Sequence, residues 1–283
     1  MIKSIKYVPT NNIKACIIFV HGMCEHQLRY QRFANYLKDH GFLVLTYDQK
    51  GHGQSVNDIC DLGFISSNNG FKCLVNDLDY FVDELKLEYP SLPIYIFSHS
   101  MGTIVTRNYM MQNDHKISKV VLSGAPNYVK IASLGKLLAK IIILLKGSKG
   151  HSKLLDMMVI GSFNKSVKNP VTSSDWLSYN KENVKNYLND PLCGYSFTNS
   201  AYYDLFEGIN NLGTKKYEHN NPNLEVLFIY GEQDPCVTNI NDSIKLINYK
   251  KTNKIMYENC RHEILNEDNY QTVYNDILNF FNK

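Results

Sequence analysis

The stretch with the clearest chemical potential is residues 94–103, because its character changes abruptly in the middle. Residues 94–97 form a short apolar run that predicts a buried strand, and residues 104–111 are apolar with helical spacing. Ser100 therefore lies where a strand turns sharply into a helix, the context of a nucleophile elbow. Such a turn strains the serine backbone, exposes the hydroxyl and directs the next N–H towards an oxyanion. Gly102 supplies the small neighbour that this turn needs.

A serine nucleophile also requires an imidazole base and a carboxylate to orient that base. Asp234 follows the apolar run 224–230, and His262 follows the short run 254–257. Ser100, Asp234 and His262 thus each follow a predicted strand, which places them at the carboxyl edge of a parallel sheet, where such sheets bind ligands. Their order along the chain differs from the chymotrypsin and subtilisin orders. We predict these three residues to be catalytic.

Each assignment has an ordinary alternative. The serine stretch alone is compatible with a strand-to-helix turn that has no chemistry, and Asp234 with a plain turn residue before Pro235. His262 is one of nine histidines, and most lone histidines are surface residues. His99, beside the serine, is expected to pack and form hydrogen bonds rather than act as a base. The coincidence of three positions favours the catalytic interpretation.

Residues 48–55 contain a second G-x-G-x-S pattern, but we interpret it as a structural loop. No apolar helical run begins at Ser55, so that serine lacks the context of an elbow. Asp48 is an alternative for the triad acid, and His52 is expected to be a hydrogen-bonded loop residue.

Three motifs together resemble the α/β-hydrolase family, and within it the monoglyceride lipase and lysophospholipase group. They are Ser98-His99-Ser100-Met101-Gly102, His21-Gly22-Met23 and the run 48–55, and the resemblance covers nearly the whole chain. It implies an α/β fold with a mostly parallel, doubly wound sheet and an inserted helical lid. It also implies that the backbone N–H groups of Met23 and Met101 form the oxyanion hole. The sequence departs from the family pattern at Ser98 and Thr103, where relatives have glycine.

The apolar pattern alternates between strands and helices along most of the chain, as in a doubly wound sheet. Besides the elbow, we expect strands at 5–8, 15–20, 42–47, 119–123, 224–230 and 254–257 and helices at 31–40, 73–89 and 270–281. From Ala125 to about residue 204 this alternation breaks down. We therefore predict a hydrolase core at 1–125 and 205–283, with a lid at 126–204 that the family resemblance places there.

The predicted lid contains strongly apolar segments at 128–139 and 141–145, followed by a predicted flexible hinge at 147–150. Residues 162–174 show no regular period, and the motif Asp190-Pro191-Leu192 resembles one found near the lid's return to the sheet. Three interpretations of the apolar pieces stay open: lining of an acyl pocket, transient contact with a membrane surface, or packed lid core.

Composition narrows the compartment and the partners. The net charge of +3 over 283 residues is small and scattered, so no nucleic-acid partner is expected. Seven cysteines, without a C-x-x-C pair, argue for reduced thiols in a cytosol-like compartment and against a zinc site. The N-terminal residues lack the apolar core of a signal peptide. We expect a cytoplasmic protein, peripheral to membranes at most, with no metal or organic cofactor, and oligomeric state stays open.

The chemistry thus predicts a serine hydrolase of carboxylic esters, and the resemblance implies a monoacylglycerol or lysophospholipid substrate. One alternative is an esterase of small substrates or a serine aminopeptidase, since one fold serves many chemistries. An aminopeptidase needs a carboxylate near the substrate amine, and although Glu182 and Asp175 lie in the predicted lid, nothing marks them for that role. A further alternative is a catalytically silent module that binds a lipid or ester.

Overall fold

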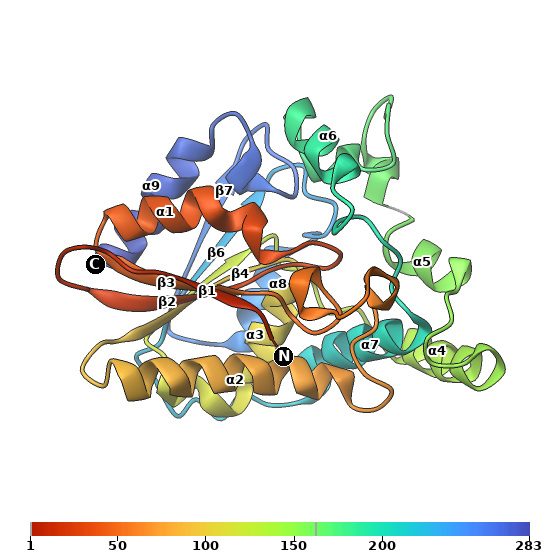
Figure 1. The fold of residues 1–283 in the computed structure, drawn as a ribbon, viewed down its shortest axis with the longest axis horizontal. Helices are drawn as coiled ribbons and strands as arrows, with labels where there is room; N and C mark the ends of the chain where they lie inside the picture. The colour runs from red at the N-terminus through yellow and green to blue at the C-terminus, as the bar shows by residue number, and fades with distance from the viewer. Residues whose placement is uncertain (1, 162) are drawn as a thin grey trace.

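A twisted sheet runs through the middle of the computed structural model, which describes residues 2–161 and 163–283 (Figure 1). Within these residues the sheet has seven strands, in the spatial order β1-β3-β2-β4-β5-β6-β7. The strands are β1 (Ser4–Tyr7), β2 (Ala15–Val20), β3 (Phe42–Tyr47), β4 (Ile94–His99), β5 (Lys119–Ser123), β6 (Glu225–Gly231) and β7 (Lys251–Tyr257). Only β1 pairs antiparallel, at the edge beside β3, and the other strand pairs are parallel.

The four strands β2 to β5 are buried on both faces, which explains their unbroken apolar runs. Helices cover both sides of the sheet, as Figure 1 shows, with α1 and α9 above it and α2, α3 and α8 below it. The helices are α1 (Gln31–Asp39), α2 (Gly70–Glu88), α3 (Met101–Asn113), α4 (Ala132–Lys146), α5 (Lys153–Val159), α6 (Lys181–Asn189), α7 (Asn199–Thr214), α8 (Ile240–Ile247) and α9 (Tyr270–Asn282). The predicted α/β-hydrolase fold is confirmed.

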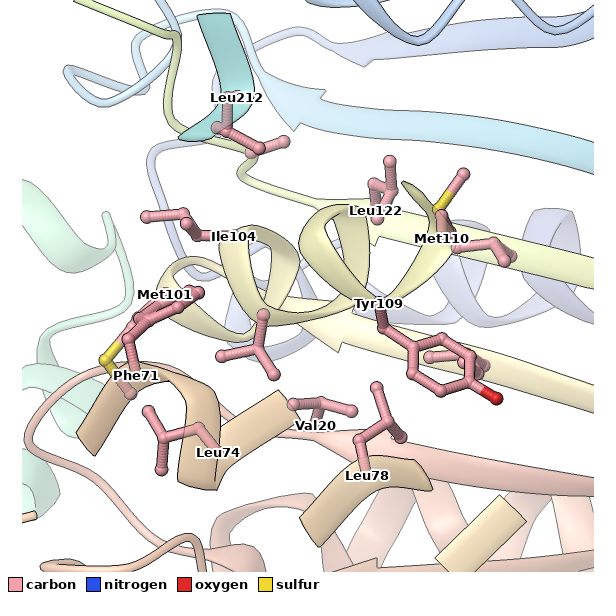
Figure 2. Packing of buried hydrophobic residues seen from close by; sticks show 14 of the residues in the cluster. Val20, Phe71, Leu74, Leu78, Met101, Ile104, Tyr109, Met110, Leu122 and Leu212 are labelled. Atoms are coloured by element: carbon pink, nitrogen blue, oxygen red, sulfur yellow. The ribbon is translucent and has the colours of Figure 1, made fainter. Parts of the chain in front are cut away.

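The larger core lies between the sheet and helices α2, α3 and α7. Figure 2 shows Phe71, Leu74 and Leu78 of α2 facing Met101 and the rest of helix α3. These α2 side chains recur every three to four residues, so they fall on one face of the helix. That face packs against α3 and the sheet. Burying each such side chain contributes roughly 1.5–3 kcal/mol. This packing fixes α3, and with it the start of that helix at the elbow.

Between β5 and β6 the chain leaves the sheet and forms α4 to α7, seen at the right of Figure 1. The two apolar pieces predicted at 128–139 and 141–145 join in the single helix α4. Helix α7 runs across residue 204, where the sequence placed the end of the lid, and it packs against α4 as well as α2 and α3. The division into core and lid stays a prediction, and Ser162 of the irregular stretch 162–174 lies outside the described residues.

Four helices were not individually expected from the sequence, α5, α6, α7 and α8. The predicted strands and the other helices appear with small shifts at their ends; β4 continues to His99 and β7 begins three residues earlier than expected. None of the helices in the described part of the chain has the length and apolar character to span a bilayer.

Candidate active site

Ser100 lies between β4 and α3 with backbone angles φ 50° and ψ −120°. A non-glycine residue rarely adopts a positive φ, so the turn is strained as a nucleophile elbow requires. Gly102 makes this geometry possible, because a Cβ there would lie 2.1 Å from the carbonyl oxygen of Val20 and 2.6 Å from that of His21. The elbow therefore packs in close contact with the end of β2, at a distance that only a glycine allows.

The two departures from the family pattern fit into this turn. Ser98 is fully buried in β4, and its hydroxyl donates a hydrogen bond to the Val121 carbonyl of the neighbouring strand at 3.3 Å. The Thr103 hydroxyl donates to the carbonyl oxygen of Ser100 at 2.7 Å. Both hydroxyls are thus paired within the elbow, and neither displaces the serine.

Asp234 and His262 follow β6 and β7, and they meet at the carboxyl edge of the sheet as the sequence predicted. Both carboxylate oxygens of Asp234 lie 2.9 Å from His262 Nδ1. Burial of the imidazole works against its charged form, but the negative charge of Asp234 outweighs burial and raises the pKa of His262 well above its ordinary value. This geometry leaves Nε2 as the ring nitrogen that faces away from the carboxylate.

Ser100 and His262 line one cavity of about 550 Å³. Its wall is mostly apolar and is built by α3, α4, α5 and α7. The apolar lining includes Ile104, Val129, Ile131, Met158, Phe163, Leu205, Phe206 and Ile209. A concave, mainly apolar site with a few convergent polar groups is typical of a ligand pocket.

Met23 and Met101 line the same cavity. Met101 is the first residue of α3, so its N–H belongs to the helix N-terminus, where N–H groups have no partner within the helix and the dipole favours negative charge. Met23 follows Gly22, whose N–H donates to the Glu25 carboxylate at 2.5 Å and fixes the loop. The predicted oxyanion-hole residues therefore lie beside the serine; their role stays a prediction.

Comparison with known proteins places this geometry in a family. The model of the family described as serine aminopeptidase, S33, matches residues 11–269. The chain belongs to this family. This match, together with curated relatives named monoglyceride lipase, confirms the predicted resemblance to α/β hydrolases of the monoglyceride lipase group.

Relatives and solved structures agree with that assignment. Mouse monoglyceride lipase is 30% identical over 187 residues, which are 65% of this chain and 54% of the mouse protein. The chain thus aligns with about half the length of the curated relatives it matches. A carboxyl esterase from Bacillus coagulans matches with a TM-score of 0.88 at 23% identity, over 99% of this chain and 93% of the esterase. The monoacylglycerol lipase of Paleococcus ferrophilus matches with a TM-score of 0.75 at 20% identity, over 99% of this chain and 98% of the lipase. At these identities the structures support the fold alone.

A buried charge network that the sequence did not reveal adjoins the candidate site, and its two glutamates line the cavity. Arg29 donates to both oxygens of Glu263, at 2.6 and 2.7 Å, and to Glu25 at 2.9 Å. Burial alone would raise the pKa of Glu263, but the charge of Arg29 lowers it to about 2. Glu25 fixes the loop after β2 (residues 21–25), which we call the oxyanion loop after its predicted role. Glu263 adjoins His262 in the loop after β7 (residues 258–267), which we call the base loop after the predicted role of His262. One guanidinium therefore connects these two loops.

The base loop also bonds to the segment 175–183 of the predicted lid. The Asn183 amide donates to Glu263 at 2.7 Å, and Arg261 Nη1 donates to the Asp175 carbonyl oxygen at 2.6 Å. The Glu267 carboxylate accepts hydrogen bonds from this segment, including one from the Ser178 hydroxyl at 2.8 Å. This segment and the loop of His262 therefore form one hydrogen-bonded unit.

Trp176 is a second feature that the sequence analysis missed. Its ring centroid lies 5.1 Å from that of His262, and it lines the cavity. It is the only tryptophan of the chain, and this was the one sequence signal that could have drawn attention to it.

His99 also packs against His262, with 4.6 Å between the ring centroids. Burial together with the His262 charge lowers the pKa of His99 to about 4. His99 is therefore neutral at pH 7.

The second G-x-G-x-S loop has a different structure. The Asp48 carboxylate accepts hydrogen bonds from the backbone N–H groups of Gln27 and Gln54, both at 2.8 Å. The Ser55 hydroxyl donates to the Asp48 carbonyl oxygen at 2.7 Å, and burial lowers the pKa of His52 to about 3. These contacts engage the Asp48 carboxylate and the Ser55 hydroxyl within the loop, in keeping with the structural interpretation.

Proposed function

We propose that this protein is a serine hydrolase that cleaves carboxylic esters through an acyl-enzyme on Ser100. The observation that carries the proposal is the convergence of a strained serine and an aspartate–histidine pair on one apolar cavity. In the proposed mechanism His262 Nε2 takes the Ser100 hydroxyl proton as the oxygen attacks the ester carbonyl carbon. Asp234 holds the ring and stabilises the imidazolium.

The N–H groups of Met23 and Met101 would stabilise the tetrahedral oxyanion, and each such donor typically contributes about 3 kcal/mol. His262 then gives its proton to the departing alcohol oxygen, and the C–O bond of the ester breaks. A water molecule, deprotonated by His262, attacks the acyl-enzyme and releases the fatty acid with Ser100 restored.

We propose a monoacylglycerol or a lysophospholipid as the substrate, in line with the names of the curated relatives. The long apolar wall suits one acyl chain, while Ser173, Ser174 and Thr238 give the cavity a smaller polar portion for a head group. The single-chain character of these lipids matches one continuous cavity of about 550 Å³.

The charges of the cavity argue against the aminopeptidase alternative, although the family description carries that name. Binding the free amine of a peptide requires an ionised carboxylate that is not already paired with another group. Glu25 and Glu263 are the carboxylates that line the cavity within the described residues, and both are bonded to Arg29. Asp175 instead accepts hydrogen bonds from Val171 and Thr172. These acids are therefore already partnered.

We further propose that residues 126–204 act as a lid and that helix α4 touches membrane surfaces. Its side chains Leu134, Leu137, Ile141, Leu144 and Leu145 are exposed, and Ile131 is both exposed and part of the cavity lining. Exposed lysines such as Lys140 and Lys146 accompany them and suit an anionic lipid surface. All seven cysteines are free thiols, which supports a reducing, cytosol-like compartment.

A fluorophosphonate probe tests the nucleophile. We expect the native protein to be labelled, the Ser100→Ala variant to lose labelling, and Ser55→Ala in the second G-x-G-x-S loop to keep it. Labelling that persists in Ser100→Ala would refute the assigned nucleophile, and a native protein that resists the probe would favour the silent binding module.

A substrate panel tests the acyl slot. Initial rates on p-nitrophenyl esters of rising chain length, on monoacylglycerols and on lysophospholipids should favour chains well beyond acetate. A sharp optimum at acetate would support the small-ester alternative, and Ser100→Ala is the blank for each substrate.

A further inference from the structure

We propose that His26, Asp190 and Cys193 bind a zinc ion outside the active site. Their ligand atoms all lie within 4.8 Å of one another, and His26 Nε2 is 2.8 Å from Asp190 Oδ2. His26 follows the oxyanion loop, whereas Asp190 and Cys193 follow α6. The site would therefore join two segments more than 160 residues apart in sequence. The sequence led us to expect no metal and argued against a zinc site, because the cysteines form no C-x-x-C pair and no spacing motif connects these three residues.

The donor set suits zinc. An imidazole nitrogen, a carboxylate oxygen and a thiolate sulfur are the three ligand types that Zn²⁺ accepts in proteins, and harder ions such as Mg²⁺ avoid sulfur. One Zn²⁺ with one carboxylate and one thiolate has no net charge, so a partly buried position is acceptable. Tetrahedral ligands at zinc distances lie about 3.3–3.8 Å apart, so the trio needs only small movements to close around the ion.

The backbone already holds the three side chains in place. The Asp190 carbonyl oxygen accepts from the Cys193 N–H at 3.0 Å, and Asp190 Oδ1 accepts from the Leu192 N–H at 2.9 Å, which forms a tight turn. The Gly194 N–H donates to the carbonyl oxygen of Cys24 at 3.0 Å and fixes this turn to the oxyanion loop. The ligands are therefore preorganised on both segments, which lowers the ordering cost of binding.

Binding changes the protonation of two groups. The Cys193 thiol loses its proton to solvent as the Zn–S bond forms, so one proton is released per ion. The imidazole coordinates through Nε2, and its proton then resides on Nδ1. The Asp190 side chain is 30% exposed while that of His26 is 7% exposed, so water reaches the fourth coordination position from the Asp190 side. No redox step is involved.

The consequence is a reversible cross-link between the oxyanion loop and the segment that leads back to the sheet. Zinc binds the folded arrangement and not the dispersed ligands of the unfolded chain, so it raises the melting temperature. At a hundredfold excess of free zinc over its Kd we expect a rise of about 5 °C.

Metal titration of the full chain tests the proposal. The chelator-treated protein is titrated with Zn²⁺ against a chromophoric chelator and, separately, with Co²⁺, whose thiolate charge-transfer absorption reports sulfur ligation. We expect one ion per chain, a cobalt–thiolate band and the melting shift. In Cys193→Ser and His26→Ala we expect zinc affinity to fall at least about tenfold, with loss of the cobalt band in Cys193→Ser.

Two control variants separate this site from its rivals. Asp234, Cys236 and His262 form a second trio of potential ligands inside the active site. Cys236→Ser and the exposed-thiol variant Cys60→Ser should keep both the band and the affinity. Loss of the band in Cys236→Ser, unchanged binding in Cys193→Ser, or no binding to native protein would overturn the proposal. Melting curves of the metal-free variants show that each is folded.

Discussion

Two regions around the cavity, the segment 175–183 and helix α4, are built in opposite ways. The segment 175–183 is hydrogen-bonded through polar groups to the loop of His262; for example, Asn183 Nδ2 donates to Glu263 Oε2 at 2.7 Å. Helix α4 instead rests on α7 through a small buried face, where Gly135 adjoins Phe206, and exposes Leu144 and Leu145 to solvent at 79% and 77%. Polar buttressing suits the positioning of catalytic groups, whereas an exposed apolar face suits contact with lipid. We therefore propose that the two parts of the predicted lid have separate tasks.

The largest expected effect comes from the carboxylate of Asp234, which is bonded to His262 of the base loop. We expect Asp234→Asn to lower kcat about 10⁴-fold on every ester, soluble or lipid, because the imidazole loses its orienting charge. The pH dependence of the activity gives a second test of the Asp234–His262 pair. In the proposed mechanism neutral His262 is the base. We therefore expect activity to rise with pH through the pKa of His262, which the charge of Asp234 raises well above its ordinary value of about 6.5. Removing the charge should move this limb to lower pH, and a limb that stays or moves upward would contradict the pair.

The next effect concerns the buried network that joins the base loop to its surroundings. Arg29→Met leaves Glu25 and Glu263 buried without their cation, so we expect the free energy of unfolding at pH 7 to fall by about 3–5 kcal/mol. Urea unfolding measures this loss. Without the cation the carboxylates protonate at higher pH, so the deficit should shrink as the pH falls.

The matched control for Arg29 is Lys6→Met on the molecular surface. Lys6 bonds Glu84 and Glu88 at 2.7 and 2.6 Å, so it also serves two carboxylates, but its side chain is 30% exposed. We expect a cost of at most about 1 kcal/mol. Equal losses in the two variants would mean that the buried network has no special weight.

The smallest effect, and the one confined to lipid, concerns helix α4. We expect the double variant Leu144→Glu and Leu145→Glu to bind anionic vesicles at least about tenfold more weakly, since each inserted leucine contributes up to about 1.5–3 kcal/mol. Its kcat on a short soluble ester should stay within about twofold. Vesicle co-sedimentation and ester assays measure the two quantities.

The control for α4 is Leu87→Glu at the end of α2, a leucine that is 86% exposed on another part of the surface. It should leave vesicle binding unchanged. If Leu87→Glu weakens binding as much as the α4 variant, the membrane contact is not a property of this helix.

The fold and the three proposed catalytic residues could be predicted because their signals are local. The elbow is a change of character within a few residues around Ser100, and Asp234 and His262 each follow a strand. Helix α7 was not predicted, and its glycines Gly208 and Gly213 have low helix propensity. In the structure these glycines admit the rings of Phe71 and Tyr128, which a Cβ would meet at 2.2 and 2.3 Å. Tertiary packing, not local propensity, explains them.

The charge network could not be predicted for a different reason. Arg29 and Glu263 are 234 residues apart, and only the folded sheet brings them together. Lys140 likewise suggested an interruption between two apolar pieces, but it lies on the exposed side of the continuous helix α4. A single charged residue on a solvent face does not end a helix, and sequence periodicity alone does not say which face meets solvent.

The position of Trp176 makes the molecule its own optical probe. The chain has a single indole, and that indole adjoins the imidazole of His262. A protonated imidazole quenches indole emission more strongly than a neutral one, so fluorescence followed across pH reads the charge of His262 in the resting protein without any turnover. The same signal would report, in real time, the arrival of an acyl chain beside the ring.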